Sequence, residues 1–349
     1  MRPWLPALLV CVLAAQETTE QVFRATVNVV VAPVTVTDKN GDYVHDLQPR
    51  HFRLFDNGKP QDIKVDVSFL PISLVVAVQA NYAVEAILPK VQKAAPLFQG
   101  ILAGEQGEVA VLAFDHRIRL MQDFTSDADR IDEALQQVRP GSTSSRMIDA
   151  TREAIRMLAR RPGERRRIVL LISETRDRSS EAGAREVMTY AQLHNVLIYT
   201  VNINRVVTLL TSQPPPARPD PLPPAARPLP AGVPATPETV RQSTGYGISG
   251  DAVPLFVEIF RQAKSIFVDN PAEVFTEYTG GREYAFSTQR VLEEALHKIS
   301  EELRSQYILS YTPNNKLEGG FHEIKVQIAG RRDVQVNTRT GYWMAAVPD

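Results

Sequence analysis

The sequence predicts an α/β domain with a mostly parallel central sheet, inserted into a small antiparallel β-sandwich. Between residues 72 and 203, apolar runs alternate with amphipathic helical patterns, which is typical of a parallel sheet covered on both faces. Short alternating strands stand at both ends of the chain, and neither end has enough strands for a sandwich alone. Because the ends of a domain usually lie close together, we expect the two β segments to pair with each other.

The composition narrows the class of partner. The chain has 349 residues, which suits two or three domains better than one. Lys and Arg number 39 against 40 Asp and Glu, so the chain lacks the basic excess that a nucleic-acid partner requires. A single cysteine excludes disulfide staples and cysteine-ligated metal sites. We therefore expect no nucleic-acid partner.

The first 15 residues have the pattern of a secretory signal. A short positive start precedes about a dozen apolar residues, which end in small residues before Gln16 and Glu17. We expect cleavage after Ala15. The apolar run is too short for a stable transmembrane anchor, and no later stretch approaches 18 consecutive apolar residues. The mature protein is therefore predicted to be secreted or periplasmic, without a stable membrane anchor after signal removal.

The N-terminal part of the sandwich is predicted at residues 22–70. A β-branched run at 27–36 leads to an Asn-Gly turn signal at residues 40 and 41. Alternating strands at 51–55 and 63–67 follow, separated by a second turn. These features are typical of a small antiparallel module.

The α/β domain is predicted at residues 71–305. Its expected strands are at 72–78, 108–114, 167–173 and 196–203, with a short antiparallel strand at 118–121. Its expected helices are at 82–98, 126–138, 147–159 and 180–193. Ser126 is the expected N-cap of the second helix, because Asp129 stands three residues later.

A Pro-rich insertion at residues 211–250 interrupts this domain. Eleven prolines fall within residues 214–237, a composition that indicates extended or disordered chain. Helical periodicity returns weakly at 252–268. The α/β domain then ends with expected helices at 273–278 and 288–303 and a strand at 282–286. The C-terminal part of the sandwich is predicted at 306–349, with strands at 306–311, 321–328 and 334–337.

No enzymatic motif is visible in the sequence. No phosphate-binding glycine loop follows a predicted strand, and no Gly-x-Ser-x-Gly elbow occurs. No two histidines have metal-ligand spacing on a helix, and each is expected to be an ordinary surface or partly buried side chain. The six are His45, His51, His116, His194, His297 and His322. We therefore expect a protein that is not an enzyme.

Three loops are expected to meet at the carboxyl ends of the parallel strands, where open α/β sheets bind ligands. They follow the strands at 72–78 and 167–173, and precede the helix at 147–159. Their sequences are Gln-Ala-Asn-Tyr-Ala at 79–83, Ser-Glu-Thr-Arg-Asp at 173–177 and Gly-Ser-Thr-Ser-Ser at 141–145.

The order of elements, the Gly-Ser-Thr loop before a helix and the acidic residue after a strand resemble a von Willebrand factor type A domain. The flanks are similar to the N- and C-terminal segments of the VWFA-related proteins that are abundant in acidobacteria. These flanking motifs are TVTDKNGDYVHDLQPRHFRLFDNGKPQ, EELRSQYILSYTPNN, GGFHEIKVQI and NTRTGYW. The resemblance covers nearly the whole mature chain except the Pro-rich stretch.

The resemblance implies a metal-ion-dependent adhesion site, with departures. The family pattern is Asp-x-Ser-x-Ser after the first strand, a Thr from a later loop and an Asp after a later strand. Here Gln79 replaces the Asp, Asn81 the first Ser and Ala83 the second. Thr143 matches, whereas Glu174 replaces the later Asp unless Asp177 reaches the site.

These departures predict a degenerate site that holds no metal and no other cofactor. Mg²⁺ prefers anionic oxygen ligands; here a carboxylate becomes a neutral amide, and Ala83 removes one oxygen ligand altogether. Gln79 and Asn81 are expected to hydrogen-bond the loops together in place of the metal. Weak Mg²⁺ binding through Gln79, Asn81, Thr143 and Glu174, with recruitment of a partner's carboxylate, is the alternative. A hydrolase that uses Thr143 or Ser144 with Glu174 is the weakest hypothesis, since no base is evident.

Two further groups of charged residues are interpreted as structural. Asp115 and Asp123, which flank the short antiparallel strand, are expected to be solvated loop carboxylates. Five arginines before the strand at 167–173 are expected to form a solvated turn, and a patch for an anionic partner is the alternative. They are Arg160, Arg161, Arg165, Arg166 and Arg167.

Overall fold

The computed structural model describes the chain in nine segments. They are residues 29–66, 70–101, 107–162, 165–174, 177, 179–203, 270–315, 318–331 and 333–344. The predicted signal segment, the Pro-rich insertion and the predicted helix at 252–268 lie outside the described residues. Within these segments no helix is both long and apolar enough to cross a membrane.

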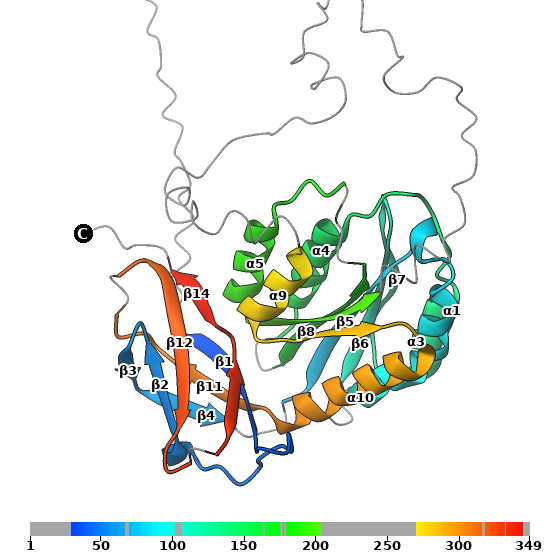
Figure 1. Cartoon of the computed structure of the whole chain (residues 1–349). Coiled ribbons are helices and arrows are strands. Elements are labelled where there is room, and N and C mark those ends of the chain that lie inside the picture. The colour runs from blue at the N-terminus through cyan, green and yellow to red at the C-terminus, as the bar shows by residue number, and fades with distance from the viewer. Residues whose placement is uncertain are drawn as a thin grey trace, which may run out of the picture.

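A six-stranded sheet forms the centre of the α/β domain (Figure 1). The strand order is β10-β9-β8-β5-β6-β7, with all neighbours parallel except β7, which is antiparallel to β6. The strands are β5 (Ile72–Gln79), β6 (Glu108–Phe114), β7 (Ile118–Thr125), β8 (Arg166–Ser173), β9 (Val196–Ile203) and β10 (Glu283–Phe286). Every residue of β5 is buried, as a strand covered on both faces requires.

Helices cover both faces of this sheet, which confirms the predicted fold class. One face packs against α1 (Leu88–Lys93), α2 (Ala95–Ile101), α3 (Ala128–Gln136) and α10 (Gln289–Ser305). The other packs against α4 (Met147–Ala159), α5 (Ala184–Leu193) and α9 (Pro271–Thr279). Each cluster joins the apolar stripe of its helices to one face of the sheet, with aliphatic and aromatic side chains.

Two helices differ from the sequence prediction. The expected helix at 82–98 is instead a 3-10 turn at Tyr82–Val84 followed by α1 and α2. Pro89 and Pro96 each stand second in one of these helices, and a proline favours a helix start over a helix interior. The N-cap of α3 is Asp127 rather than Ser126, because the Asp127 carboxylate accepts the backbone N–H of Asp129 at 3.0 Å.

Two antiparallel four-stranded sheets form the sandwich, in the orders β13-β1-β11-β4 and β14-β12-β2-β3. The N-terminal strands are β1 (Val30–Thr37), β2 (Phe52–Asp56), β3 (Lys59–Gln61) and β4 (Ile63–Asp66). The C-terminal strands are β11 (Tyr307–Tyr311), β12 (Gly320–Ile328), β13 (Gln335–Thr338) and β14 (Gly341–Met344). Each sheet contains strands from both ends of the chain, so the α/β domain is inserted into one sandwich. The sequence prediction did not include β14.

The two parts of the molecule share a buried polar junction. α10 leads directly into β11, and its Glu302 is fully buried between them. The Glu302 carboxylate lies 3.1 Å from Arg282 Nε and accepts the Tyr284 hydroxyl at 3.3 Å. Burial raises the pKa of Glu302, although the charge of Arg282 opposes that shift.

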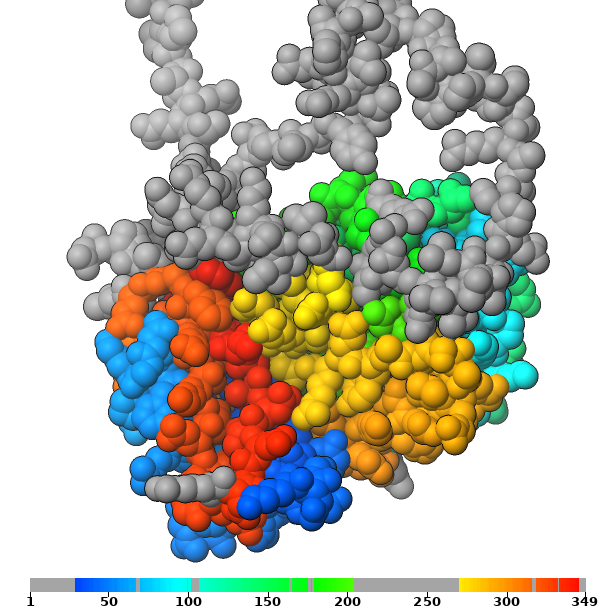
Figure 2. Space-filling view, in the orientation of Figure 1, coloured from blue at the N-terminus to red at the C-terminus, as the bar shows by residue number. Residues whose placement is uncertain are grey.

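A second set of contacts joins α5 and α9 to the β13–β14 segment, and Figure 2 shows α9 (yellow) lying against that segment (red). The Gln192 amide donates to the carbonyl of Gly341 at 3.2 Å and accepts the backbone N–H of Trp343 at 3.3 Å. The backbone N–H of Thr340 donates to the carbonyl of Glu277 at 3.4 Å. These bonds hold the edge of the sandwich against the α/β domain.

The arginine cluster before β8 is not the solvated turn that the sequence predicts. Arg161 makes two bonds to the Glu108 carboxylate, at 2.7 and 2.6 Å. Arg166 is half-buried and donates to the carbonyl of Leu303, and Arg167 donates to the carbonyl of His194. Of the five, Arg160 is exposed as expected. The others join strands and helices at the amino ends of the parallel strands, because each guanidinium has several donors in a fixed plane.

Candidate functional site

The carboxyl edge of the central sheet is closed by loops that bond to one another through their backbones. The N–H of Ala80 donates to the carbonyl of Phe114 at 2.8 Å. The N–H of Gly141 donates to the carbonyl of Ala80, and the N–H of Tyr82 to that of Ser142, both at 2.9 Å. The loops after β5 and β6 and the loop before α4 therefore form one cross-linked surface.

The structure brings the four predicted site positions together at this edge. Gln79 and Asn81 are 0 % and 3 % exposed. The Gln79 amide nitrogen donates to Asn81 Oδ1 at 3.0 Å, and its oxygen accepts the backbone N–H of Glu174 at 2.9 Å. Asn81 Nδ2 donates to the carbonyl of Thr143 at 3.5 Å, whereas the Thr143 side chain is exposed. Gln79 thus joins two loops that follow different strands.

Asp177 does not reach these residues, so it does not supply the family's later Asp. Its carboxylate instead accepts the backbone N–H of Ile148 at 2.7 Å and the N–H and hydroxyl of Ser180 at 2.9 and 2.6 Å. It therefore caps the first turn of α4, where a carboxylate also favours the helix dipole.

Asp149 fixes the other side of this loop to α4. The carboxylate is buried and accepts the backbone N–H groups of Glu181 and Ala182 at 2.9 and 3.0 Å. Arg146 lies 2.7 Å from it. Burial alone would raise the pKa of Asp149, but these hydrogen bonds outweigh burial and lower it.

Asp115 corrects another expectation, because it is only 2 % exposed rather than solvated. Its carboxylate accepts the backbone N–H of Arg117 at 2.7 Å and that of Ser142 at 3.1 Å. A Cβ atom on Gly141 would lie 1.6 Å from Asp115 Oδ2, so only glycine fits beside this carboxylate. Asp123, by contrast, is exposed as expected. An acidic residue directly after a buried strand was the signal for Asp115, but the sequence does not show what covers it.

Part of the chain matches a known family model. Residues 79–175 match the family model described as the von Willebrand factor type A domain, and this range contains β6, β7, β8, α3 and α4. The central domain therefore has the fold of a von Willebrand A domain. No curated protein is significantly similar to it in sequence.

Several solved structures are similar to the chain in fold. An aerotolerance-related membrane protein from Bacteroides fragilis is 12% identical, with 66% of this chain and 98% of that chain covered and a TM-score of 0.40. The conserved hypothetical protein BatB from Bacteroides thetaiotaomicron is 13% identical, with 66% and 99% covered and a TM-score of 0.38. Proximal thread matrix protein 1 from the mussel byssus is 12% identical, with 70% and 49% covered and a TM-score of 0.40.

The residues at the adhesion-site position of this von Willebrand A domain do not fit Mg²⁺. The Gln79 and Asn81 side-chain oxygens already accept hydrogen bonds from within the site, and Ala83 offers no side-chain ligand. Across the described segments, no group of three or more His, Cys, Asp or Glu side chains has the geometry to hold a metal ion. Hard cations require several oxygen ligands, usually including carboxylates.

The sandwich holds a buried polar cluster that the sequence did not predict. His322 is 0 % exposed, rather than an ordinary surface or partly buried histidine, and its Nδ1 lies 2.6 Å from Asp56 Oδ1. The same carboxylate accepts Asn315 Nδ2 at 3.0 Å and the hydroxyls of Tyr311 and Tyr342 at 2.9 and 2.7 Å. Burial would raise the pKa of Asp56, but its hydrogen bonds, led by that of His322, lower it.

Proposed function

We propose that this protein is an exported, non-enzymatic protein-binding or scaffold protein whose von Willebrand A domain works without a metal ion. Von Willebrand A domains are protein-interaction or adhesion modules, which supports a role in binding another protein. The signal-like first 15 residues support export.

One observation carries the metal-free part of the proposal. The Gln79 side chain occupies the first ligand position and uses its oxygen to hold the backbone of Glu174, while its nitrogen holds Asn81. These two bonds connect the loops that a metal ion joins in the family. A cation that took the Gln79 oxygen would have to break the bond to Glu174 and leave that amide without its acceptor.

The absence of a nucleophile–base pair supports the non-enzymatic part. In the described chain, neither the Thr143 nor the Ser144 hydroxyl bonds to an imidazole or a carboxylate. Ser144 instead donates its backbone N–H to the Ser142 hydroxyl at 3.3 Å. A hydroxyl without a neighbouring base is a weak nucleophile at neutral pH.

Metal-dependent adhesion is the second candidate. Its support is that Thr143 and Glu174, the positions that keep an oxygen-bearing side chain, lie on the same edge as Gln79. In this alternative a weakly bound Mg²⁺ recruits a carboxylate of the partner.

Calorimetric titration of Mg²⁺ and Mn²⁺ into EDTA-treated mature protein separates the two candidates. We expect neither binding heat nor a thermal shift. Saturable binding that Glu174→Ala removes, and that the control Glu186→Ala on exposed α5 surface does not, would establish the metal-dependent alternative instead.

Export is tested independently by expressing the full chain in a bacterium that secretes proteins and sequencing the N-terminus of the product. We expect the mature chain to begin at Gln16. Recovery of an unprocessed chain in the cytoplasm would contradict export.

A further inference from the structure

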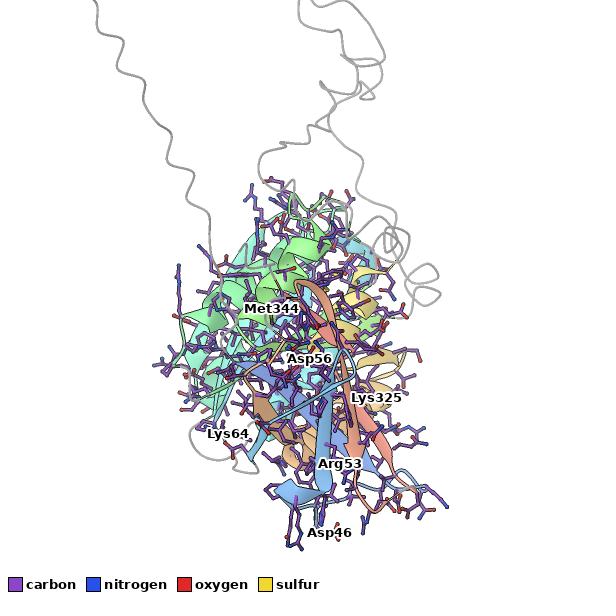
Figure 3. The ribbon with its side chains drawn as sticks, turned by 90° about the vertical axis from the view of Figure 1, so that its left-hand side faces the viewer. Asp46, Arg53, Asp56, Lys64, Lys325 and Met344 are labelled. Carbon is purple, nitrogen blue, oxygen red and sulfur yellow. The ribbon has the colours of Figure 1, made fainter. Side chains whose placement is uncertain are left out.

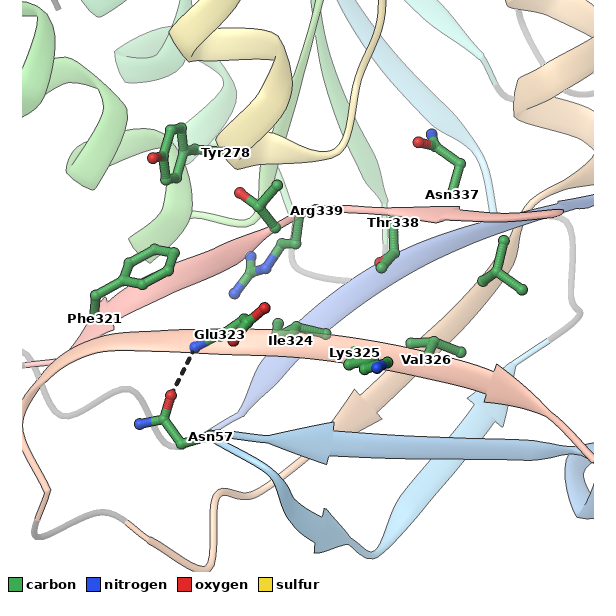
Figure 4. Close-up of a pocket in the computed structure, with 12 residues that line it drawn as sticks. Asn57, Tyr278, Phe321, Glu323, Ile324, Lys325, Val326, Asn337, Thr338 and Arg339 are labelled. Carbon is green, nitrogen blue, oxygen red and sulfur yellow. Dashed lines mark hydrogen bonds between the residues drawn. The ribbon is translucent and has the colours of Figure 1, made fainter. Parts of the chain in front are cut away.

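A groove of about 630 Å³ separates β12 from β13 at one edge of the sandwich (Figure 4). It exists because the chain from β13 to β14 changes sheets. β13 pairs with β1 in one sheet, whereas β14 pairs with the first half of β12 in the other. The two strands therefore diverge along the second half of β12, and the groove lies between them.

Both walls of the groove are open strand edges. Among the described strands, β12 pairs only with β2 along Ile324–Ile328, and β13 pairs only with β1. The backbone N–H of Asn57 donates to the carbonyl of Glu323, and that of Ala329 donates to the carbonyl of His51. The backbone N–H and C=O groups of the odd-numbered residues of β12 therefore face β2. Because backbone groups alternate along an antiparallel strand, the N–H and C=O of Val326 face the groove. The N–H of Ile324, another even-numbered residue, faces the same side, because it donates to the Thr340 carbonyl at 2.9 Å.

Arg339 extends from the end of β13 across this groove towards β12 (Figure 4). It is 4 % exposed, and burial lowers its pKa. Its Nε is buried without a hydrogen-bond acceptor, and within the described segments no carboxylate lies at ion-pair distance from it. Its guanidinium lies over the face of the Tyr342 ring, 5.3 Å away, and the charge of Asp56 acts on it from farther off. A buried guanidinium without an anionic partner is unfavourable, so this arrangement indicates a site for an anion.

Two hydroxyl groups near Arg339 are also buried without hydrogen-bond partners within the described chain. They belong to Thr338 and Thr340, which line the groove. Asp56 lies on the core side, but both of its oxygens are engaged by the four donors described above. Lys325 adds a positive charge at the rim, and Glu323 a negative one.

We propose that this groove binds an extended acidic peptide segment of a partner protein, which adds as a strand beside β12 and places a carboxylate on Arg339. β14 lies beside the first half of β12, and the added strand would lie on the same side of β12 along Ile324–Ile328. The partner's backbone would satisfy the open edge at Val326, and its carboxylate would take two bonds from the Arg339 guanidinium. A strand without an acidic side chain would leave Arg339 unpaired, and a small anion would leave the strand edges unpaired.

This inference deepens the proposed protein-binding function and rests on it, but it is independent of the metal question. All binding is therefore measured in buffer that contains EDTA. A metal site would appear in the Mg²⁺ titration, whereas a failure of the groove would appear here.

The probe is a library of random seven-residue peptides displayed on phage, selected against the full mature chain and counter-selected against Arg339→Gln. We expect the enriched peptides to share one Asp or Glu flanked by β-branched residues. In the best synthetic peptide, changing that acid to its amide is expected to weaken binding about tenfold or more, which is the scale of a charge-assisted hydrogen bond. Two further peptides are N-methylated at either the odd-numbered or the even-numbered backbone amides. At least one of the two is expected to lose binding, because a methylated amide cannot pair with a strand edge.

Protein variants locate the site. Arg339→Gln is expected to weaken the peptide about tenfold or more, and Arg339→Lys to weaken it less, since Lys keeps the charge but loses the planar fork. Arg53→Gln is the matched control, because Arg53 is an exposed arginine on β2 of the same sandwich (Figure 3). Circular dichroism of each variant checks the fold.

Four results would overturn the proposal. They are a selection that enriches nothing, peptides without a shared acid, full binding by both N-methylated forms, and acetate that protects the protein against heat as well as the peptide does. Because the peptide variants are tested on the unaltered protein, they remain decisive even where a protein variant fails to fold.

Discussion

The carboxyl edge of the central sheet and the groove beside β12 are opposites in their polar chemistry. At the sheet edge, buried Gln79 and Asn81 are paired with each other and with neighbouring loops. At the groove, buried Arg339 and two threonine hydroxyls are unpaired within the described chain. The position that binds ligands in the family is thus internally satisfied here, whereas the unsatisfied groups lie on the sandwich that surrounds the domain.

The difference has an energetic meaning. A buried polar group without a partner costs about 1–3 kcal/mol, so a protein retains several together only where something outweighs that cost. Binding of a partner is one such compensation, and sites of this kind commonly reduce the stability of the unbound protein. The sheet edge is expected to contribute to stability, and the groove to reduce it.

The largest predicted effect lies beneath the groove. Asp56→Ala removes the common acceptor of His322 and three other donors, and it is expected to lower the free energy of unfolding by about 3–5 kcal/mol. Urea denaturation measures this loss. Asp46→Ala is the control, because Asp46 is exposed and pairs with Arg331 only at 3.5 Å, and it is expected to cost about 1 kcal/mol at most. Equal losses in the two variants would show that the buried cluster is not structurally important.

A second prediction concerns the tight loop at the sheet edge. Gly141→Ala places a methyl group against Asp115 Oδ2 and is expected to cost about 1–3 kcal/mol, since the loop must move to admit it. Gly100→Ala in α2 is the control, because nothing lies within 4 Å of its added Cβ. The control is expected to be neutral or slightly stabilising, as alanine is a better helix former. A neutral Gly141→Ala would mean that the Asp115 contact is easily displaced.

A third prediction sets the two regions directly against each other. Gln79→Leu leaves the Glu174 N–H without an acceptor and is expected to cost about 1–3 kcal/mol. Arg339→Met removes a buried cation that has no ion-pair partner within the described chain, and it is expected to leave stability unchanged or raise it by about 1 kcal/mol. Thermal unfolding of both variants provides the comparison. A loss at Arg339 as large as that at Gln79 would remove the contrast between the regions.

The smallest predicted effect is a pair of opposite pH dependences. The pKa of Asp56 is lowered in the fold, so its contribution to stability is present above the unfolded value of about 3.9 and is lost as pH falls through the folded pKa. The pKa of Glu302 is raised in the fold, so its effect has the opposite sign. Stability should decline as pH rises from about 4.3, the unfolded value, through the folded pKa.

Urea midpoints measured at a series of pH values test both signs. Asp56→Asn is expected to weaken the acid-induced loss, and Glu302→Gln to remove a decline that begins above about pH 4.3. Parallel pH profiles for wild type and both variants would show that neither carboxyl group governs the response.

The sequence was sufficient for the strand and helix order because that order depends on local patterning. The run at 196–203 and the helix at 147–159 match β9 and α4 residue for residue. The same patterning aligned Gln79, Thr143 and Glu174 at one edge of the sheet, since parallel strands end together.

What the sequence did not predict depends on contacts between distant residues. Asp56 and His322 are 266 positions apart, so neither position alone indicates a buried pair. The exposure of Asp115 depends on how the loop at residues 141–145 folds over it. The sequence of β14, Gly-Tyr-Trp-Met, has no alternation of polar and apolar residues, and without β14 the groove beside β12 is not evident.

The inserted topology also imposes an order of folding. In the first sheet, the strand neighbours of β1 among the described residues are β11 and β13, and Val30 lies opposite Tyr311. During synthesis, β1 therefore emerges long before β11 and β13 exist, while its hydrophobic face is already complete. Pairing over so long a stretch of chain is intrinsically slow. The α/β domain has local strand neighbours and is expected to fold first, and its formation brings the ends of β4 and β11 side by side. Until then the N-terminal strands expose apolar side chains and unpaired strand edges, which are the features that chaperones bind. A chain truncated before β11 would remain in that state.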